Sequence, residues 1–173
     1  NPQLFNILEQ ASRMSSFPEY RSIAKNLTIK YKYRLNKGSL AASFTLSDNH
    51  NSKYNLQDYK GHYVYLFFWA GWCPLSMQSI EAMKKVADDF HDQVSIVGVL
   101  VDRDRSDVDH FLKNAEFLFP LLHFDGDYEL LSRFGVTTIP FYILIGPDGR
   151  FFEYPFVPPH WGAHEAFEEI LGE

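Results

Sequence analysis

The residues of this sequence with the clearest capacity for chemistry are Cys73, its only cysteine, and the residues beside it. Trp72 precedes Cys73, Pro74 follows it, and Ser76 lies three residues further on. Proline suits the first position of a helix, because the N–H that it lacks would have no partner there. A helix that begins at Pro74 would direct its free N–H groups and the positive end of its dipole at the Cys73 sulfur, which favours a thiolate over a thiol. The pattern therefore predicts one activated, nucleophilic sulfur.

The alternative for Cys73 is an inert buried thiol, because free cysteine packs as a small apolar side chain. Its place directly after Trp72 and at a helix start, away from the apolar stripe of that helix, favours the reactive interpretation. A second segment of interest is Val136-Thr137-Thr138-Ile139-Pro140, which precedes an apolar run. A proline at this point is confined to a turn or the edge of a sheet, because it has no N–H for a strand partner.

The elements that position these residues follow from hydrophobic spacing. Tyr63 to Trp69 is an apolar run that predicts a buried strand, and apolar residues at helical spacing predict a helix from Pro74 to Phe90. The other predicted elements are strands over 41–46, 94–101, 141–145 and 150–154, a short apolar segment over 117–122, and helices from Ser106 to about Ala115, over 128–134 and over 163–171. Strands that alternate with helices predict an α/β fold with a central sheet covered on both faces.

The first 36 residues predict two helices, the second of which starts at Ser16-Phe17-Pro18-Glu19. The turn Asn36-Lys37-Gly38-Ser39 indicates a boundary. We therefore expect residues 1–38 to be a helical extension, or the end of a preceding domain, and residues 39–173 to be one domain. Five cations make the second helix and its end basic, namely Lys25, Lys30, Lys32, Arg34 and Lys37. They predict a solvated face, with a docking surface for an acidic partner as the alternative.

Trp72-Cys73-Pro74-Leu75-Ser76 after a Phe-Phe-Trp-Ala strand end resembles the active-site segment of thioredoxin-fold proteins. It is most similar to the TlpA/ResA branch of bacterial envelope thiol–disulfide oxidoreductases, and the similarity runs from about Ala41 almost to the C-terminus. The resemblance implies a thioredoxin-like three-layer sandwich with a central mixed sheet. It also implies a cis Pro140 with Ile139 opposite Cys73, and a substrate-binding platform of Trp72, Pro74, Thr138, Ile139 and Pro140.

Two positions depart from the pattern of that branch. Its members carry a second cysteine where this chain has Ser76, and ResA-like members carry a glutamate where this chain has Ser79. A serine hydroxyl can hydrogen-bond a thiolate, but it cannot resolve a mixed disulfide. We therefore expect monothiol exchange with protein thiols or disulfides, with Cys73 as the nucleophile and Ser76 in the resolving position. The resemblance implies a location in the bacterial periplasm or cell envelope, and a redox partner that is periplasmic or membrane-bound.

The rival hypothesis is a redox-inactive binding module that keeps the thioredoxin fold and recognises a protein or peptide partner. Peroxidase chemistry is disfavoured, because Ala70 and Leu66 stand where a peroxiredoxin would carry threonine and proline.

His160 and His164 have the i, i+4 spacing of two metal ligands on a helix, but the sequence shows no third ligand nearby. Four aspartates over 102–109 lack the glycine and the terminal glutamate of a calcium loop. We expect neither a metal nor a cofactor.

Composition excludes two further classes of function. The chain has 173 residues, 46% of them hydrophobic, which is enough for one packed domain. The formal net charge of −6 argues against a nucleic-acid surface, which needs clustered lysine and arginine. No apolar run approaches the ~18–20 residues of a membrane span, so we expect no span in this chain. One cysteine rules out an internal disulfide.

Overall fold

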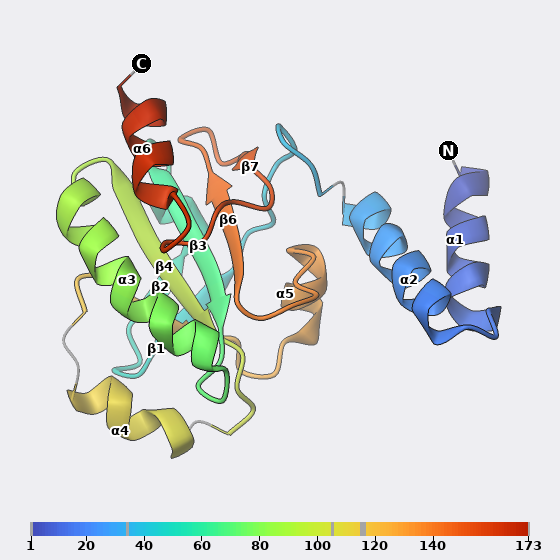
Figure 1. The fold of residues 1–173 in the computed structure, drawn as a ribbon, viewed down its shortest axis with the longest axis horizontal. Coiled ribbons are helices and arrows are strands. Elements are labelled where there is room, and N and C mark those ends of the chain that lie inside the picture. The colour runs from blue at the N-terminus through green and yellow to red at the C-terminus, as the bar shows by residue number, and fades with distance from the viewer. Residues whose placement is uncertain (1, 34, 105, 115–116, 173) are drawn as a thin grey trace.

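The apolar run before Cys73 forms β3 (Tyr63–Trp69), the central strand of the fold, and six of its seven residues are buried. In this computed structural model, which describes residues 2–33, 35–104, 106–114 and 117–172, β3 belongs to a seven-stranded sheet with the order β2-β1-β5-β4-β3-β6-β7. It pairs in parallel with β4 (Val94–Leu100) and antiparallel with β6 (Phe141–Ile145). The sheet is therefore mixed (Figure 1).

The remaining strands are short, and the helices lie between them in the chain. The strands are β1 (Thr45–Asp48), β2 (Lys53–Asn55), β5 (Leu121–His123) and β7 (Phe151–Glu153). The helices are α1 (Pro2–Met14), α2 (Pro18–Tyr33), α3 (Pro74–Phe90), α4 (Ser106–Asn114), α5 (Tyr128–Arg133) and α6 (Ala163–Leu171), with a 3₁₀ turn at Leu56–Tyr59. Among these helices, none is long and apolar enough to cross a membrane.

Alternate residues of β3 face opposite sides of the sheet, and each side has its own core. Tyr65, Phe67 and Trp69 pack with α3, α4 and α6 in one core. Val64, Leu66 and Phe68 pack with α5 and the segment before β1 in the other. The predicted three-layer α/β arrangement is confirmed, and the end of β3 leads through a short loop into α3 (Figure 1).

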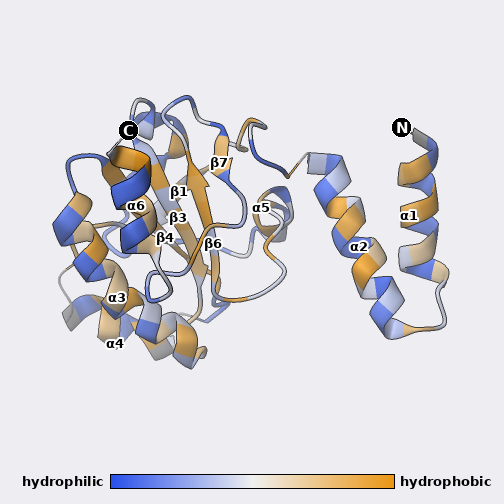
Figure 2. Ribbon diagram, turned by 45° about the horizontal axis from the view of Figure 1, so that its top comes forward, coloured by the Kyte–Doolittle hydropathy of each residue, from blue (hydrophilic) through white to orange (hydrophobic). Residues whose placement is uncertain are grey.

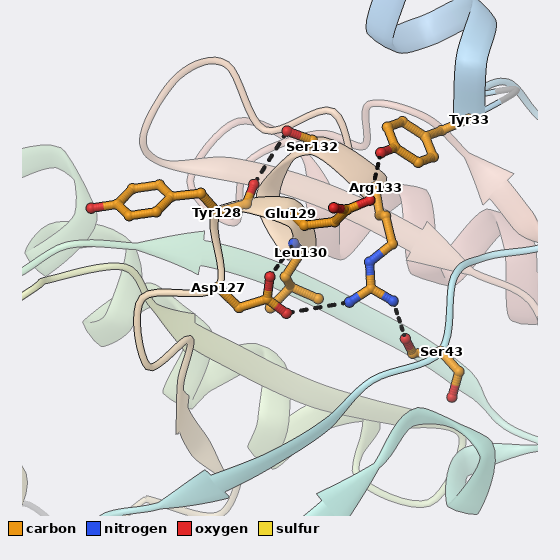
Figure 3. A network of polar contacts seen from close by, with 8 residues as sticks. All are labelled: Tyr33, Ser43, Asp127, Tyr128, Glu129, Leu130, Ser132 and Arg133. Atoms are coloured by element: carbon orange, nitrogen blue, oxygen red, sulfur yellow. Dashed lines mark hydrogen bonds and ion pairs between the residues drawn. The ribbon is translucent and has the colours of Figure 1, made fainter.

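The two predicted N-terminal helices form a hairpin of α1 and α2 beside the sheet, and Figure 2 shows hydrophobic residues along both. Ile29 and Tyr33 of α2 pack against the core on the α5 side of the sheet. The Tyr33 hydroxyl also donates a hydrogen bond of 3.0 Å to the Glu129 carboxylate of α5 (Figure 3). Arg133 in turn donates to the carbonyl of Ser43, so α5 connects the hairpin to the sheet domain.

The chain already contacts the sheet domain at Leu35, which lies before the predicted boundary at residue 38. Leu35 is 1% exposed within the α5-side core, and the Gly38 N–H donates to the carbonyl of Phe151 at 2.7 Å. The division into 1–38 and 39–173 stays a prediction. Arg34 and Ala115, where the predictions place a cation and a helix end, lie outside the described residues.

The first predicted strand, over 41–46, is displaced in the structure. The strand that forms is β1, which begins at Thr45 and pairs with β2, an element absent from the predictions. The three residues of β2 are Lys53, Tyr54 and Asn55, none of them fully buried, so hydrophobic spacing gives no signal there. Asp48 closes the turn between the two strands by accepting the N–H groups of His50 and Ser52.

Candidate functional site

Cys73 is the N-cap residue of α3, with an extended backbone (φ −99°, ψ 110°), and Pro74 is the first residue of the helix. The thiol is free and 8% exposed. Its Sγ lies 3.7 Å from the carbonyl oxygen of Ile139, to which the thiol donates a hydrogen bond. The end of β3 and the segment before β6 therefore bring together the two sequence motifs, which are 66 residues apart.

The residues around the sulfur are more exposed than the sulfur itself. Trp72 is 69% exposed, Pro74 and Thr138 are also exposed, and Ile139 and Pro140 are half-buried. The Ile139–Pro140 peptide bond is cis. Trp72 and Pro74 flank Cys73 in the chain and the Ile139 carbonyl faces its sulfur, so the almost buried thiol has exposed and half-buried neighbours.

Ser76 lies in the first turn of α3 and is fully buried. Its hydroxyl accepts a hydrogen bond of 3.3 Å from the N–H of Ala70, in the loop that leads to the cysteine. The Ser76 hydroxyl therefore contacts the backbone before Cys73. The predicted hydrogen bond from Ser76 to the sulfur stays a prediction. What the hydroxyl does here is hold the loop against the helix.

One turn further along α3, Ser79 forms a buried hydrogen bond with Tyr142 of β6, at 2.5 Å between the oxygens. The Ser79 hydroxyl has a single proton and donates it to the carbonyl of Leu75, so Tyr142 is the donor in their pair. Burial raises the pKa of Tyr142 to about 12, and the charge of Cys73 adds a smaller upward contribution. A neutral hydroxyl pair therefore occupies the position at which the resemblance implies a glutamate.

The loop from Trp69 to Cys73 is anchored by Asp102, a residue whose role here the sequence analysis missed. The Asp102 carboxylate accepts a hydrogen bond of 2.6 Å from the N–H of Gly71. Asp102 follows β4, and the carboxyl ends of neighbouring parallel strands meet at one edge of a sheet, which is the signal that could have found it. Gly71 also lies against Val108 of α4, so closely that there is no space for a side chain. These contacts fix the position of the Cys73 backbone.

The other residues considered as ligands have ordinary partners. His164 contacts the Asp89 carboxylate at 3.0 Å, and the ring of His160 packs on Trp161. Asp104 accepts the N–H of Ser106 at the start of α4, and this hydrogen bond lowers the pKa of its carboxyl. Within the described part of the chain, no three histidine, cysteine, aspartate or glutamate side chains are grouped to hold a metal ion.

Residues 38–151 match the model of the AhpC/TSA family. The chain belongs to the AhpC/TSA family. The thiol-disulfide oxidoreductase ResA of Bacillus subtilis (strain 168) is 32% identical over 126 residues, which are 72% of this chain and 70% of that protein. Among solved structures, the thiol:disulfide interchange protein DsbE of Chlorobium tepidum is 28% identical, with a TM-score of 0.68, over 80% of this chain and 97% of that one.

A thiol-disulfide oxidoreductase of Bacteroides vulgatus is similar to the same degree, with 25% identity and a TM-score of 0.69 over 81% of this chain and 93% of that one. The predicted kinship with the ResA-like thiol-disulfide oxidoreductases is thus confirmed for this AhpC/TSA member. The match to the family model begins at residue 38, so the α1–α2 hairpin lies outside the matched residues.

Proposed function

We propose that this protein exchanges thiols and disulfides with protein substrates through Cys73 as its single reactive sulfur. The observation that carries the proposal is the position of Cys73 at the N-terminus of α3, with its Sγ 3.7 Å from the Ile139 carbonyl and the exposed Trp72 beside it. The ResA and DsbE relatives are named for thiol–disulfide chemistry, which supports the same assignment.

The exchange step needs no cofactor. The Cys73 thiolate attacks one sulfur of a substrate disulfide, a new S–S bond joins Cys73 to that sulfur, and the other sulfur leaves as a thiolate that takes a proton from water. A second thiol of the substrate can then attack the sulfur bound to Cys73, which frees Cys73 and leaves the substrate with a rearranged disulfide. No net oxidation or reduction occurs.

Ser76 limits the chemistry to this monothiol form. A serine in the resolving position cannot displace the substrate, so the mixed disulfide persists until another thiol arrives. We therefore favour isomerisation or long-lived capture over dithiol oxidation or reduction. In this proposal the Ser76 hydroxyl also hydrogen-bonds the thiolate when the thiol loses its proton, and it keeps its contact with Ala70 in the thiol form.

The residues around the sulfur would hold the substrate backbone. We assign Trp72 and Pro74 to apolar contact with the substrate, and Thr138, Ile139 and Pro140 to the pairing of an extended substrate segment beside the sulfur. A place in the bacterial periplasm or cell envelope fits the resemblance to the TlpA/ResA branch, and the partner there would be a periplasmic or membrane-bound redox protein.

A redox-inactive binding module is the second candidate function. It is favoured by the Ser79–Tyr142 pair, which puts two neutral hydroxyls where a ResA-like reductase has an acid, and by the inward contact of Ser76. Under this hypothesis Cys73→Ala leaves the affinity for a protein partner unchanged. Under the exchange hypothesis the same variant loses covalent capture.

The experiment that tests the proposal is the reaction of the native protein with 2,2′-dithiodipyridine, a neutral disulfide that releases a coloured thiopyridone. Attack by Cys73 should release one equivalent and leave a thiopyridyl adduct on the protein. Cys73→Ala should release none. A native chain that fails to react, when the urea-unfolded chain reacts at once, would exclude Cys73 as an exchange nucleophile.

A further inference from the structure

A groove of about 190 Å³ lies between α2 of the N-terminal hairpin and the sheet domain. Asn26, Ile29 and Lys30 of α2 form one wall. The other wall comprises Leu35, Gly135, Thr137, Phe141, Tyr154 and Pro155. The groove therefore includes a residue of the segment whose Ile139 carbonyl faces Cys73.

The groove is linked to the site at Cys73 through the segment before β6. Thr137 lies two residues before Ile139, a separation that spans about 7 Å at most in an extended chain. Thr137 and Thr138 are exposed, so the surface between the sulfur and the groove is open to a partner. A substrate segment that is attacked by Cys73 and continues past Thr138 would enter this groove within a few residues.

An exposed apolar row on α2 extends the groove. Ile23 and Leu27 are 55% and 46% exposed. They lie three residues before Asn26 and Lys30, so they are next to the groove wall on the helix surface. Exposed apolar side chains beside an open groove are typical of an interaction surface.

The charge of the hairpin indicates the kind of partner. Residues 2–33 contain five basic residues (Arg13, Arg21, Lys25, Lys30 and Lys32) and two acidic ones (Glu9 and Glu19), which is a formal charge of +3. Since the whole chain carries −6, the remainder carries −9. Lys30 brings one of these cations to the groove itself. The hairpin therefore favours a partner segment with negative charge, while the rest of the surface does not.

The hairpin is held in place by contacts of its own. Ile29 and Tyr33 pack on the α5-side core, and the Tyr33 hydroxyl donates to Glu129 (Figure 3). The groove is thus bounded by two fixed walls, and its α2 wall lies outside the residues that match the family model. Selection of substrates by this wall would be a property of this chain, added to the site that the family shares.

We propose that α2 is a substrate-selecting arm. The groove between α2 and Thr137 receives an extended segment of the protein substrate next to its reactive cysteine, with acidic side chains facing Lys30 and apolar side chains facing Ile23 and Leu27. This inference rests on the proposed exchange function of Cys73, and it names the substrate class as acidic and apolar around the reactive sulfur.

The test uses the full chain and two peptides that carry one cysteine as a 2-thiopyridyl disulfide, flanked by leucine and glutamate in one and by leucine and lysine in the other. Cys73 attacks the peptide sulfur, the thiopyridone leaves, and no net redox change occurs. The rate is measured beside that with 2,2′-dithiodipyridine, which has the same leaving group and no peptide. We expect the acidic peptide to react about two- to fivefold faster than the basic one, the range for one exposed ion pair.

Lys30→Glu should abolish or reverse this preference and leave the 2,2′-dithiodipyridine rate within about twofold. Arg21→Glu is the matched control, because Arg21 is exposed and lies nine residues earlier and about 180° around the same helix, where it makes the same change of charge away from the groove. Leu27→Ser should slow both peptides about fivefold and the small disulfide not at all, with Met14→Ser on α1 as its control.

Equal rates for the two peptides, or equal effects of Lys30→Glu and Arg21→Glu, would overturn the proposal. It would also be overturned if sedimentation showed that the wild type is a dimer and that Leu27→Ser dissociates it. The same holds if Leu27→Ser abolished binding of the protein to phosphatidylglycerol vesicles but left the rates with both peptides unchanged. A wild type that fails to react even with 2,2′-dithiodipyridine would instead remove the exchange function itself.

Discussion

Gly71 offers a sharp test of how the loop that carries Cys73 is held. A Cβ added at Gly71 would lie 1.9 Å from Cγ1 of Val108 and 3.4 Å from Cβ of the same residue. Val108 is 2% exposed, and its branched side chain is stiff at χ1, so it cannot turn away at low cost. Ordinary carbon contacts are about 3.5–4.0 Å, so Gly71→Ala requires the loop or α4 to move by roughly 1.5–2 Å.

We expect Gly71→Ala to lower the free energy of unfolding by about 1–3 kcal/mol, as overpacking of a filled site does. A displacement of this size at the residue two before Cys73 should also slow the exchange rate, by about 10²-fold if the sulfur moves by 1 Å. Gly146→Ala is the matched control, because the nearest atom to its added Cβ is a carboxylate oxygen of the exposed Asp148, at 3.3 Å.

The rescue variant Gly71→Ala with Val108→Ala separates a steric cause from any other. Val108→Ala removes Cγ1 and leaves the nearest atom of that residue at 3.4 Å, close to ordinary contact. The single Val108→Ala variant should lose about 2 kcal/mol of stability and keep its exchange rate. The double variant should recover most of the rate with 2,2′-dithiodipyridine. A wild-type rate for Gly71→Ala, or purely additive effects in the double variant, would refute the steric explanation.

Three further outcomes are expected. Leu35→Ala should lower the free energy of unfolding in urea by about 2–4 kcal/mol, because Leu35 is 1% exposed, whereas Leu40→Ala at a 62% exposed site should change it by less than about 0.5 kcal/mol; equal losses would contradict the placement of Leu35. Since burial raises the pKa of Tyr142 to about 12, the folded protein holds this proton more tightly than the unfolded chain does, and the contribution of Tyr142 to stability should fall by roughly 2 kcal/mol as the pH rises from about 10 to about 12. Tyr142→Phe should make this slope shallower, and an unchanged slope would assign it to other groups. Ser76→Cys should place a second sulfur on the same helix face as Cys73, so that a mixed disulfide at Cys73 resolves within the protein; a mass spectrum in which the adduct persists as long as in the wild type would count against the resolving role of this position.

The sequence predicted the parts of the fold that depend on local signals. β3, α3 and β6 follow from apolar runs, helical spacing and two prolines, so the residues on both sides of Cys73 could be placed in advance. The hairpin of β1 and β2 could not, since its second strand has only three residues and is stabilised by pairing with Thr45–Ser47.

The contacts that shape the site depend on residues far apart in the chain. Tyr142 reaches Ser79 across 63 residues, and Asp102 reaches Gly71 across 31, so neither contact has a local signature. Ser76 shows the same limit, because the residue type predicts a partner for its hydroxyl but does not determine that the Ala70 N–H is that partner.

The most direct test of the central claim is the mass of the intact native protein after incubation with a peptide that carries an activated thiopyridyl disulfide. One added peptide mass, mapped to Cys73 and removed by dithiothreitol, is the result expected of a monothiol exchange protein whose Ser76 cannot release the substrate. A native protein that stays unmodified, while the urea-unfolded chain takes up the peptide at once, would contradict the claim and favour a redox-inactive binding module.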